Sequence, residues 1–314
     1  MSRRLVPSLC LLALLSLAPA AAKTSGDAFE AISATLKTAL ADSGARGDAL
    51  FIGRGDSIFY VESMGKADFG TPVRLSPKSN LAELMLVLSL ADSGFLGLDE
   101  PARNYLKFDK KDEFAAATVR QLMSERAANG KTAERAARTL RLVAESATAR
   151  PWDSLFAEWI AKPLALTATG YPKPANFSKA LGTMPSASAL TTNVRDYARL
   201  LSVLANGGNQ NGVQVLSARS SALVFHPQLI GSEACARKGE GETCLLIEED
   251  AVGLYAWVDR SRGIYGVLAA PGSEVSIASA GRAIRAQAET IIDREEAGAG
   301  LTAAIKRGPH STGK

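Results

Sequence analysis

The chain has 314 residues, of which 46% are hydrophobic and 22% are charged. This is the composition of an ordinary globular protein, with enough chain to bury a large core. The formal net charge is +4, and it falls to +2 if a leader containing Arg3 and Arg4 is removed (34 basic against 32 acidic residues). So small an excess argues against nucleic acid or a membrane surface as a partner.

The first 22 residues have the pattern of a signal peptide. Arg3 and Arg4 precede an apolar run that continues to Leu17, and the small residues 18–22 follow it. The apolar run is short for a bilayer span, and no later stretch looks able to cross a bilayer. We therefore expect an exported protein, periplasmic or secreted, with no membrane span after signal cleavage.

Cysteine and histidine usage limits the kinds of site that the chain can build. Cys235 and Cys244 are the two cysteines outside the leader, and a pair so close in sequence favours a disulfide in an oxidising compartment. His226 and His310 are the only histidines. A zinc site built on several histidines and a Ser-His-Asp triad are therefore not expected, and we predict no metal site and no cofactor.

The N-terminal part predicts a helix followed by a hairpin. Residues 27–40 have helical spacing, and residues 49–62 indicate two strands around Arg54-Gly55-Asp56. We interpret that triplet as turn chemistry and not as an adhesion motif. Ser63-Met64-Gly65-Lys66 has the spacing Ser-x-x-Lys, but it lies at a strand end, where Gly65 disfavours a helical turn.

Residues 73–106 form the stretch around which the rest is organised. Ser76 is a good N-cap, and Pro77 suits the first helical position, where its missing N–H costs nothing. Residues 81–90 are almost all apolar, which predicts a helix packed on most sides. Gly94 can end this helix in a left-handed conformation.

The central part of the chain predicts further helices. Thr118 and Gln121 form a capping box at the start of one of them. Residues 133–147 and 152–160 have helical patterns. Asn193 can cap a helix that ends at Gly207-Gly208.

The C-terminal part predicts strands and then a final helix. Residues 245–270 alternate and are rich in β-formers, with a turn at 259–263. Residues 276–294 predict a helix that packs back on the sheet. We expect the Gly-rich, basic residues 295–314 to be a disordered tail.

Four stretches of the chain resemble the serine β-lactamase and penicillin-binding-protein family, in particular its class C, esterase-like and D-alanyl-D-alanine peptidase branch. They are residues 94–106, 118–124, 163–171 and 185–217. The resemblance implies an α/β, β-lactamase/transpeptidase-like fold. Such a fold has an antiparallel sheet flanked by N- and C-terminal helices, with an inserted all-helical domain. It places the domain at 23–294, with the sheet part at 27–72 and 245–294 and the helical part at 73–244.

The catalytic motifs of that family are missing at their expected places. The family carries Ser-x-x-Lys on the first turn of its central helix, so that the lysine can take the serine proton. Counting back from Gly94 puts these residues at Pro77 and Asn80. The family's Tyr-x-Asn falls at Thr132-Ala133-Glu134, and the edge strand that carries Lys-Thr-Gly or His-Thr-Gly reads CLLIEED at residues 244–250.

These losses lead to three interpretations. In the first, the chain is a catalytically degenerate pseudo-enzyme of the cell envelope that binds a small molecule, a peptidoglycan-like ligand or an envelope protein. In the second, it is an active serine hydrolase of β-lactamase, esterase or D-Ala-D-Ala peptidase type, with Ser76 or Ser79 as nucleophile and Lys78 as the nearest amine. In the third, it is a structural envelope protein without a binding cleft. We favour the first and expect no catalytic residues at the family positions.

Overall fold

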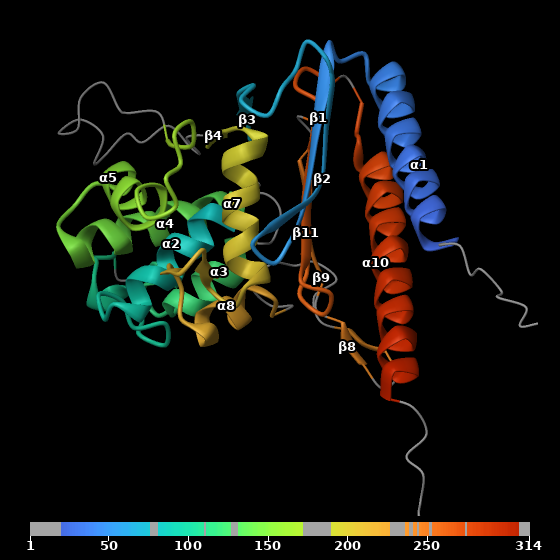
Figure 1. The fold of residues 1–314 in the computed structure, drawn as a ribbon. Helices are drawn as coiled ribbons and strands as arrows, with labels where there is room; N and C mark the ends of the chain where they lie inside the picture. The colour runs from blue at the N-terminus through green and yellow to red at the C-terminus, as the bar shows by residue number, and fades with distance from the viewer. Residues whose placement is uncertain are drawn as a thin grey trace, which may run out of the picture.

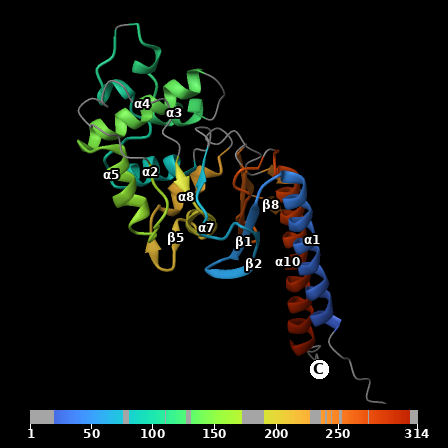
Figure 2. The same ribbon diagram turned by 90° about the horizontal axis from the view of Figure 1, so that it is seen from above.

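The computed structural model describes residues 20–75, 81–109, 111–126, 131–171, 190–226, 236–238, 241–243, 245–250, 253–273 and 275–307. An antiparallel sheet stands at the centre, with two long helices on one face and a group of helices on the other (Figure 1). The view from above shows the same three layers (Figure 2). This arrangement is the fold class that the resemblance implied.

Both ends of the described chain build the sheet. Its five strands lie in the order β2-β1-β11-β10-β9, and each neighbouring pair is antiparallel. The register between β1 and β11 pairs Ala49 with Ala269. The strands are β1 (Gly47–Arg54), β2 (Ser57–Gly65), β9 (Leu245–Asp250), β10 (Leu254–Asp259) and β11 (Ile264–Ala269).

Three further strand pairs are short. They are β3 (Val73–Arg74) with β4 (Thr191–Thr192), β5 (Asn209–Gln210) with β6 (Val213–Gln214), and β7 (Ala236–Lys238) with β8 (Gly241–Thr243). The β3–β4 pair joins the residues before the central helix to those before α7 (Val194–Ala205).

The central strands are buried on both faces, so the predicted alternation of buried and exposed residues is wrong there. All residues of β10 and β11 are buried. Tyr255 and Trp257 pack on the side of the two long helices, whereas Ala256 and Val258 belong to the core on the other side. A strand covered on both faces has no solvent face, and its sequence is mostly apolar, with Asp259 at the end of β10 as the charged exception.

The two long helices are longer than their sequence patterns predicted. α1 (Ala20–Ser43) includes the last residues of the expected leader, and residues 1–19 lie outside the described part of the chain. α10 (Ala278–Arg307) continues well beyond Arg294, so the expected disordered tail is wrong as far as Arg307. The glycines at 298 and 300 suggested disorder, but each costs a helix only about 1 kcal/mol.

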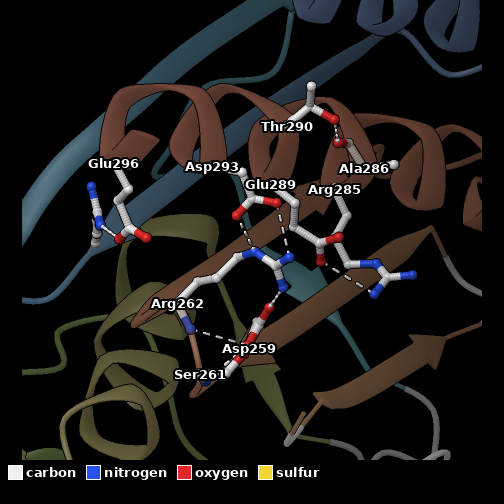
Figure 3. Close-up of polar contacts among 10 residues, drawn as sticks. Asp259, Ser261, Arg262, Arg285, Ala286, Glu289, Thr290, Asp293 and Glu296 are labelled. Atoms are coloured by element: carbon white, nitrogen blue, oxygen red, sulfur yellow. Dashed lines mark hydrogen bonds and ion pairs between the residues drawn. The ribbon is translucent and has the colours of Figure 1, made fainter. Parts of the chain in front are cut away.

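Charged side chains attach α10 to the strand ends. Arg262, in the turn between β10 and β11, donates to Asp259 and to Asp293 of α10 (Figure 3). Arg54, at the end of β1, forms an ion pair with Glu296. Arg54 belongs to the Arg-Gly-Asp turn, which is thus engaged in the fold.

The helices on the other face surround α2 (Leu81–Asp92), whose first ten residues are all buried, as predicted. Gly94 has φ +79° and ends it, with the Phe95 N–H donating to the Leu90 carbonyl at 3.0 Å. The other elements are η1 (Ala102–Asn104), η2 (Glu113–Ala115), α3 (Val119–Arg126), α4 (Lys131–Thr148), α5 (Trp152–Phe156), η3 (Ala157–Ala161), α7 (Val194–Ala205) and α8 (Ala218–Val224).

Local capping predictions are confirmed. The Gln121 N–H donates to Thr118 Oγ1 at 3.1 Å, and the Thr118 N–H donates to Gln121 Oε1 at 2.8 Å. Asn193 Oδ1 accepts from the Asp196 N–H at 2.8 Å at the start of α7. Of the helices described, none is both long and apolar enough to pass through a bilayer.

Candidate functional site

The start of α2 is the centre of the candidate site, because the family's Ser-x-x-Lys would immediately precede Leu81. The five residues concerned lie outside the described part of the chain, and so does the predicted disulfide pair. These positions are Ser76, Pro77, Lys78, Ser79, Asn80, Cys235 and Cys244. The elements around the start of α2 are described and give the chemistry of the surrounding walls.

The position assigned to Tyr-x-Asn lies on the first turn of α4. Thr132 and Glu134 are both exposed there. Neither side chain is the phenol that relays a proton in that family, and of the two only the Glu134 carboxylate is a general base. Ser63, from the Ser-x-x-Lys spacing at residues 63–66, lies on β2. In extended backbone, residues three apart point to opposite faces.

A buried ion pair joins the first turn of α2 to α4. Arg141 donates to Glu83, and the two residues are only 8% and 3% exposed. The Arg141 guanidinium carbon lies 5.5 Å from the ring centroid of Trp152 and 5.1 Å from that of Tyr171. Burial is the largest single influence and lowers the pKa of Arg141, but the interactions with Glu83, Tyr171 and Glu145 together raise it by more, so the net shift is upward. Sequence reasoning missed this pair, although Glu83 is the one charge in an apolar run.

A second buried carboxylate positions Tyr171 over Arg141. Asp196 of α7 is fully buried and accepts from the backbone N–H groups of Thr167 and Ala168, at 2.9 and 2.7 Å. Thr169 Oγ1 also contacts this carboxylate, at 3.1 Å. These hydrogen bonds hold the loop before Tyr171 against the first turn of α7.

The edge strand β9 presents a carboxylate to the helices. Glu248 pairs in register with Ala256, whose side chain lies in the core on the helical side. The buried Tyr197 of α7 donates its hydroxyl hydrogen to Glu248. Glu249 points to the other face and pairs with Arg282 of α10. The reversed charge expected at this edge is thus oriented toward the helical side.

No described residues suggest a metal centre. In the ranges that the structure covers, histidine, cysteine and acidic side chains do not gather in groups of three or more. Around the predicted positions the structure describes two separate polar pairs, Glu248 with Tyr197 and Glu83 with Arg141. Tyr197, Glu83 and Arg141 are buried.

Comparison with solved structures identifies the architecture. A candidate β-lactamase from Bacteroides dorei superposes with a TM-score of 0.69 at 16% identity, covering 84% of this chain and 99% of that one. A family VIII carboxylesterase superposes with a TM-score of 0.63 at 17% identity, covering 84% of this chain and 97% of that one. EstCE1, a hydrolase with promiscuous acyltransferase activity, superposes with a TM-score of 0.62 at 16% identity, covering 86% of this chain and 99% of that one.

Neither the protein-family models nor the curated proteins match this chain. At the identities found among solved structures, the likeness shows the fold and confirms the predicted fold class. The chemistry must be argued from the residues of this chain.

Proposed function

We propose, from the β-lactamase/transpeptidase-like fold of this chain, that it is an exported, catalytically degenerate protein that binds a ligand or partner in the cell envelope. The observation that carries the proposal is the edge strand, where the Glu248 carboxylate is held by Tyr197. The resemblance implies a cation and a hydroxyl at this place. A carboxylate there repels the carboxylate of a penicillin or a peptide substrate.

The other two motif positions support the same function. Pro77 has no nucleophile, and the amide of Asn80 is not a base. Thr132 and Glu134 supply no phenol on the first turn of α4. Without an activated nucleophile and a proton relay, acyl transfer loses the groups that lower its barrier.

Export is supported by the leader pattern of residues 1–22 and by the closely spaced Cys235 and Cys244. An envelope location makes three ligand classes accessible: small molecules, peptidoglycan-like fragments and other envelope proteins. The test for peptidoglycan fragments is a titration of purified protein with muropeptides, followed by calorimetry. Saturable heat supports a ligand-binding scaffold, and its absence with every fragment favours a structural protein without a cleft.

Covalent labelling tests the loss of catalysis. We expect purified protein to remain unlabelled by fluorescent penicillin and by a fluorophosphonate, with a class C β-lactamase as the positive control. Stable labelling of one serine would overturn the proposal.

The competing function is an active serine hydrolase that uses Ser76 or Ser79 with Lys78. The observation in its favour is that these residues directly precede α2, where a helix N-terminus stabilises developing negative charge. It requires turnover of a chromogenic ester or cephalosporin that is abolished in Ser76→Ala or Ser79→Ala. Turnover unchanged in both variants would exclude these nucleophiles.

A further inference from the structure

Two carboxyl groups lie close together beneath α1, on the face of the sheet opposite the candidate site. Asp48 of β1 pairs in register with Met64 of β2. Glu62 lies two residues before Met64, so it points to the same face and is a diagonal neighbour of Asp48. Met64 packs against the core beneath α1 and α10. Asp48 and Glu62 therefore face the two long helices.

The hydrogen bonds around Glu62 place the negative charge on this residue. Ser33 of α1 donates to one of its carboxylate oxygens at 2.8 Å, and the Tyr60 hydroxyl donates to the other at 2.5 Å. Burial and the bond to Glu62 raise the pKa of Tyr60, so the phenol keeps its proton and acts as a donor. Accepting at both oxygens is the pattern of an ionised carboxylate.

Asp48 has no comparable donors. It is 1% exposed, and within the described ranges neither of its carboxylate oxygens makes a hydrogen bond of normal geometry. Burial first and the Glu62 charge second raise the pKa of Asp48 to about 6, although the backbone N–H groups of Met64 and of Asp48 itself act in the other direction. Of the two carboxyl groups, Asp48 is thus the one that holds a proton in mildly acidic solution.

The charged groups on the surrounding elements leave an ionised Asp48 without a counter-charge. Among the described residues, Glu62 is the charged group that acts on it. β11, the other neighbour of β1, carries no charged residue. Along residues 29–46 and 278–290 the charged side chains are either exposed, as are Glu30, Lys37, Asp42 and Arg46, or paired, Arg282 with Glu249 and Arg285 with Glu289. Ionisation of Asp48 therefore requires that water reach it.

α1 is the element that can admit this water. It is the first described element of the chain, so its removal leaves the pairing of all five strands intact. The Ser33 hydrogen bond and the stacking of Phe29 on Tyr60, with ring centroids 5.4 Å apart, hold it to β2. Toward α10 the packing is open, because a groove of about 400 Å³ lies between residues 34–43 and residues 275–280.

We propose that α1 is a proton-controlled cover, which protonated Asp48 keeps on the sheet and ionised Asp48 releases while the sheet and α10 stay folded. Release uncovers an apolar face that includes Leu50 and Ile52, both fully buried when α1 is in place. The proton is bound more tightly with α1 in place, so docking is most stable below pH 3.8 and weakens as the pH rises to about 6. This interval of about two pH units allows at most about a hundredfold change in the released population.

Hydrogen exchange of the full chain at pH 4.5 and pH 8 tests the release of α1. Protection factors, which correct for the intrinsic effect of pH on exchange, report local opening. We expect those of residues 29–43 to fall by about tenfold to a hundredfold, and those of residues 278–292 of α10 to stay within about twofold. An equal fall in both helices would indicate global unfolding and overturn the proposal, as would an unchanged α1.

Two matched variants test whether Asp48 is the group that titrates. Asp48→Asn removes the ionisable group at nearly constant shape, and α1 should then be equally protected at both pH values. Asp42→Asn makes the same change at an exposed position on α1 itself and should leave the pH dependence as in the parent. A fall that persists in Asp48→Asn, or one that disappears in Asp42→Asn, would contradict the proposal.

Glu62→Gln tests the coupling of the two carboxyl groups without altering Asp48. The glutamine oxygen can still accept from Ser33, but the neighbouring negative charge is gone. Asp48 should then ionise more readily, so the midpoint of the α1 transition should move to lower pH. An unchanged midpoint would overturn the role of Glu62.

Discussion

Arg262 and Asp293 form a two-bond ion pair between a strand turn and a helix. Arg262 Nε and Nη2 donate to the two carboxylate oxygens of Asp293 at 2.8 and 3.0 Å (Figure 3). Arg262 Nη1 also donates to Asp259 at 2.7 Å. Asp259 is 3% exposed, whereas the Asp293 side chain is 52% exposed, so one arginine serves a buried and a solvated carboxylate. The hydrogen bond to Arg262 lowers the pKa of Asp293.

This difference in burial predicts unequal effects of substitution. Arg262→Ala leaves the Asp259 carboxylate buried without its cation and should lower the free energy of unfolding by about 2–3 kcal/mol. Asp293→Ala removes only the exposed partner and should cost less than about 1 kcal/mol. Urea denaturation of both variants measures the two losses, and equal losses would contradict the unequal roles.

The burial of Asp48 predicts that the free energy of unfolding falls as the pH rises. Asp48 is 1% exposed, and burial, with the nearby Glu62 charge, raises its pKa from the ordinary 3.8 to about 6. The folded state therefore binds this proton more tightly than the unfolded state. The stability that the Asp48 proton contributes is fully present below pH 3.8. It is lost as the pH rises to about 6, and the loss is at most about 3 kcal/mol.

Asp48→Asn removes this titration. We expect the variant to be more stable than the parent at pH 8 and to lose less stability between pH 4 and pH 6. Chemical denaturation at these three pH values measures the difference. A variant that is destabilised by the same amount at every pH would show that the Asp48 proton is not involved.

The Glu83–Arg141 pair predicts strong coupling between α2 and α4. Glu83→Gln removes the carboxylate that is hydrogen-bonded to a buried guanidinium and should cost about 3–5 kcal/mol. The double variant Glu83→Leu with Arg141→Met replaces both charges by apolar groups and should recover much of that loss. A double-mutant cycle by denaturation gives the coupling energy. A coupling near zero would mean that the pair contributes no specific interaction.

Two glycines of α10 predict opposite effects of the same substitution. A Cβ atom at Gly281 would lie 2.2 Å from Cδ1 of Tyr255, so α10 must move outward, and Gly281→Ala should cost about 1–3 kcal/mol. A Cβ atom at Gly298 meets nothing within 4 Å, and Gly298→Ala should stabilise the helix by about 0.5–1 kcal/mol. Thermal denaturation distinguishes the two. A stabilised Gly281→Ala would contradict the close packing of α10 on Tyr255.

Local interactions made several elements predictable from sequence. The Thr118–Gln121 box, the Asn193 cap and the left-handed Gly94 involve groups only a few residues apart. Their geometry depends on the chain immediately around them, so residue type and spacing are sufficient. The apolar run at 81–90 likewise predicted a helix buried on most sides, as observed.

The contacts that define the candidate site join residues far apart in the chain. Tyr197 and Glu248 are separated by 51 positions, and Glu83 and Arg141 by 58. Each side chain alone is compatible with a solvated surface, and only packing of α7 on the sheet and of α4 on α2 removes the water and forms the pairs. The sequence by itself determined the caps and the turns through short-range chemistry, and its resemblance to a known family implied the fold class. The tertiary structure alone decided which charges are buried together, because that depends on how the layers dock.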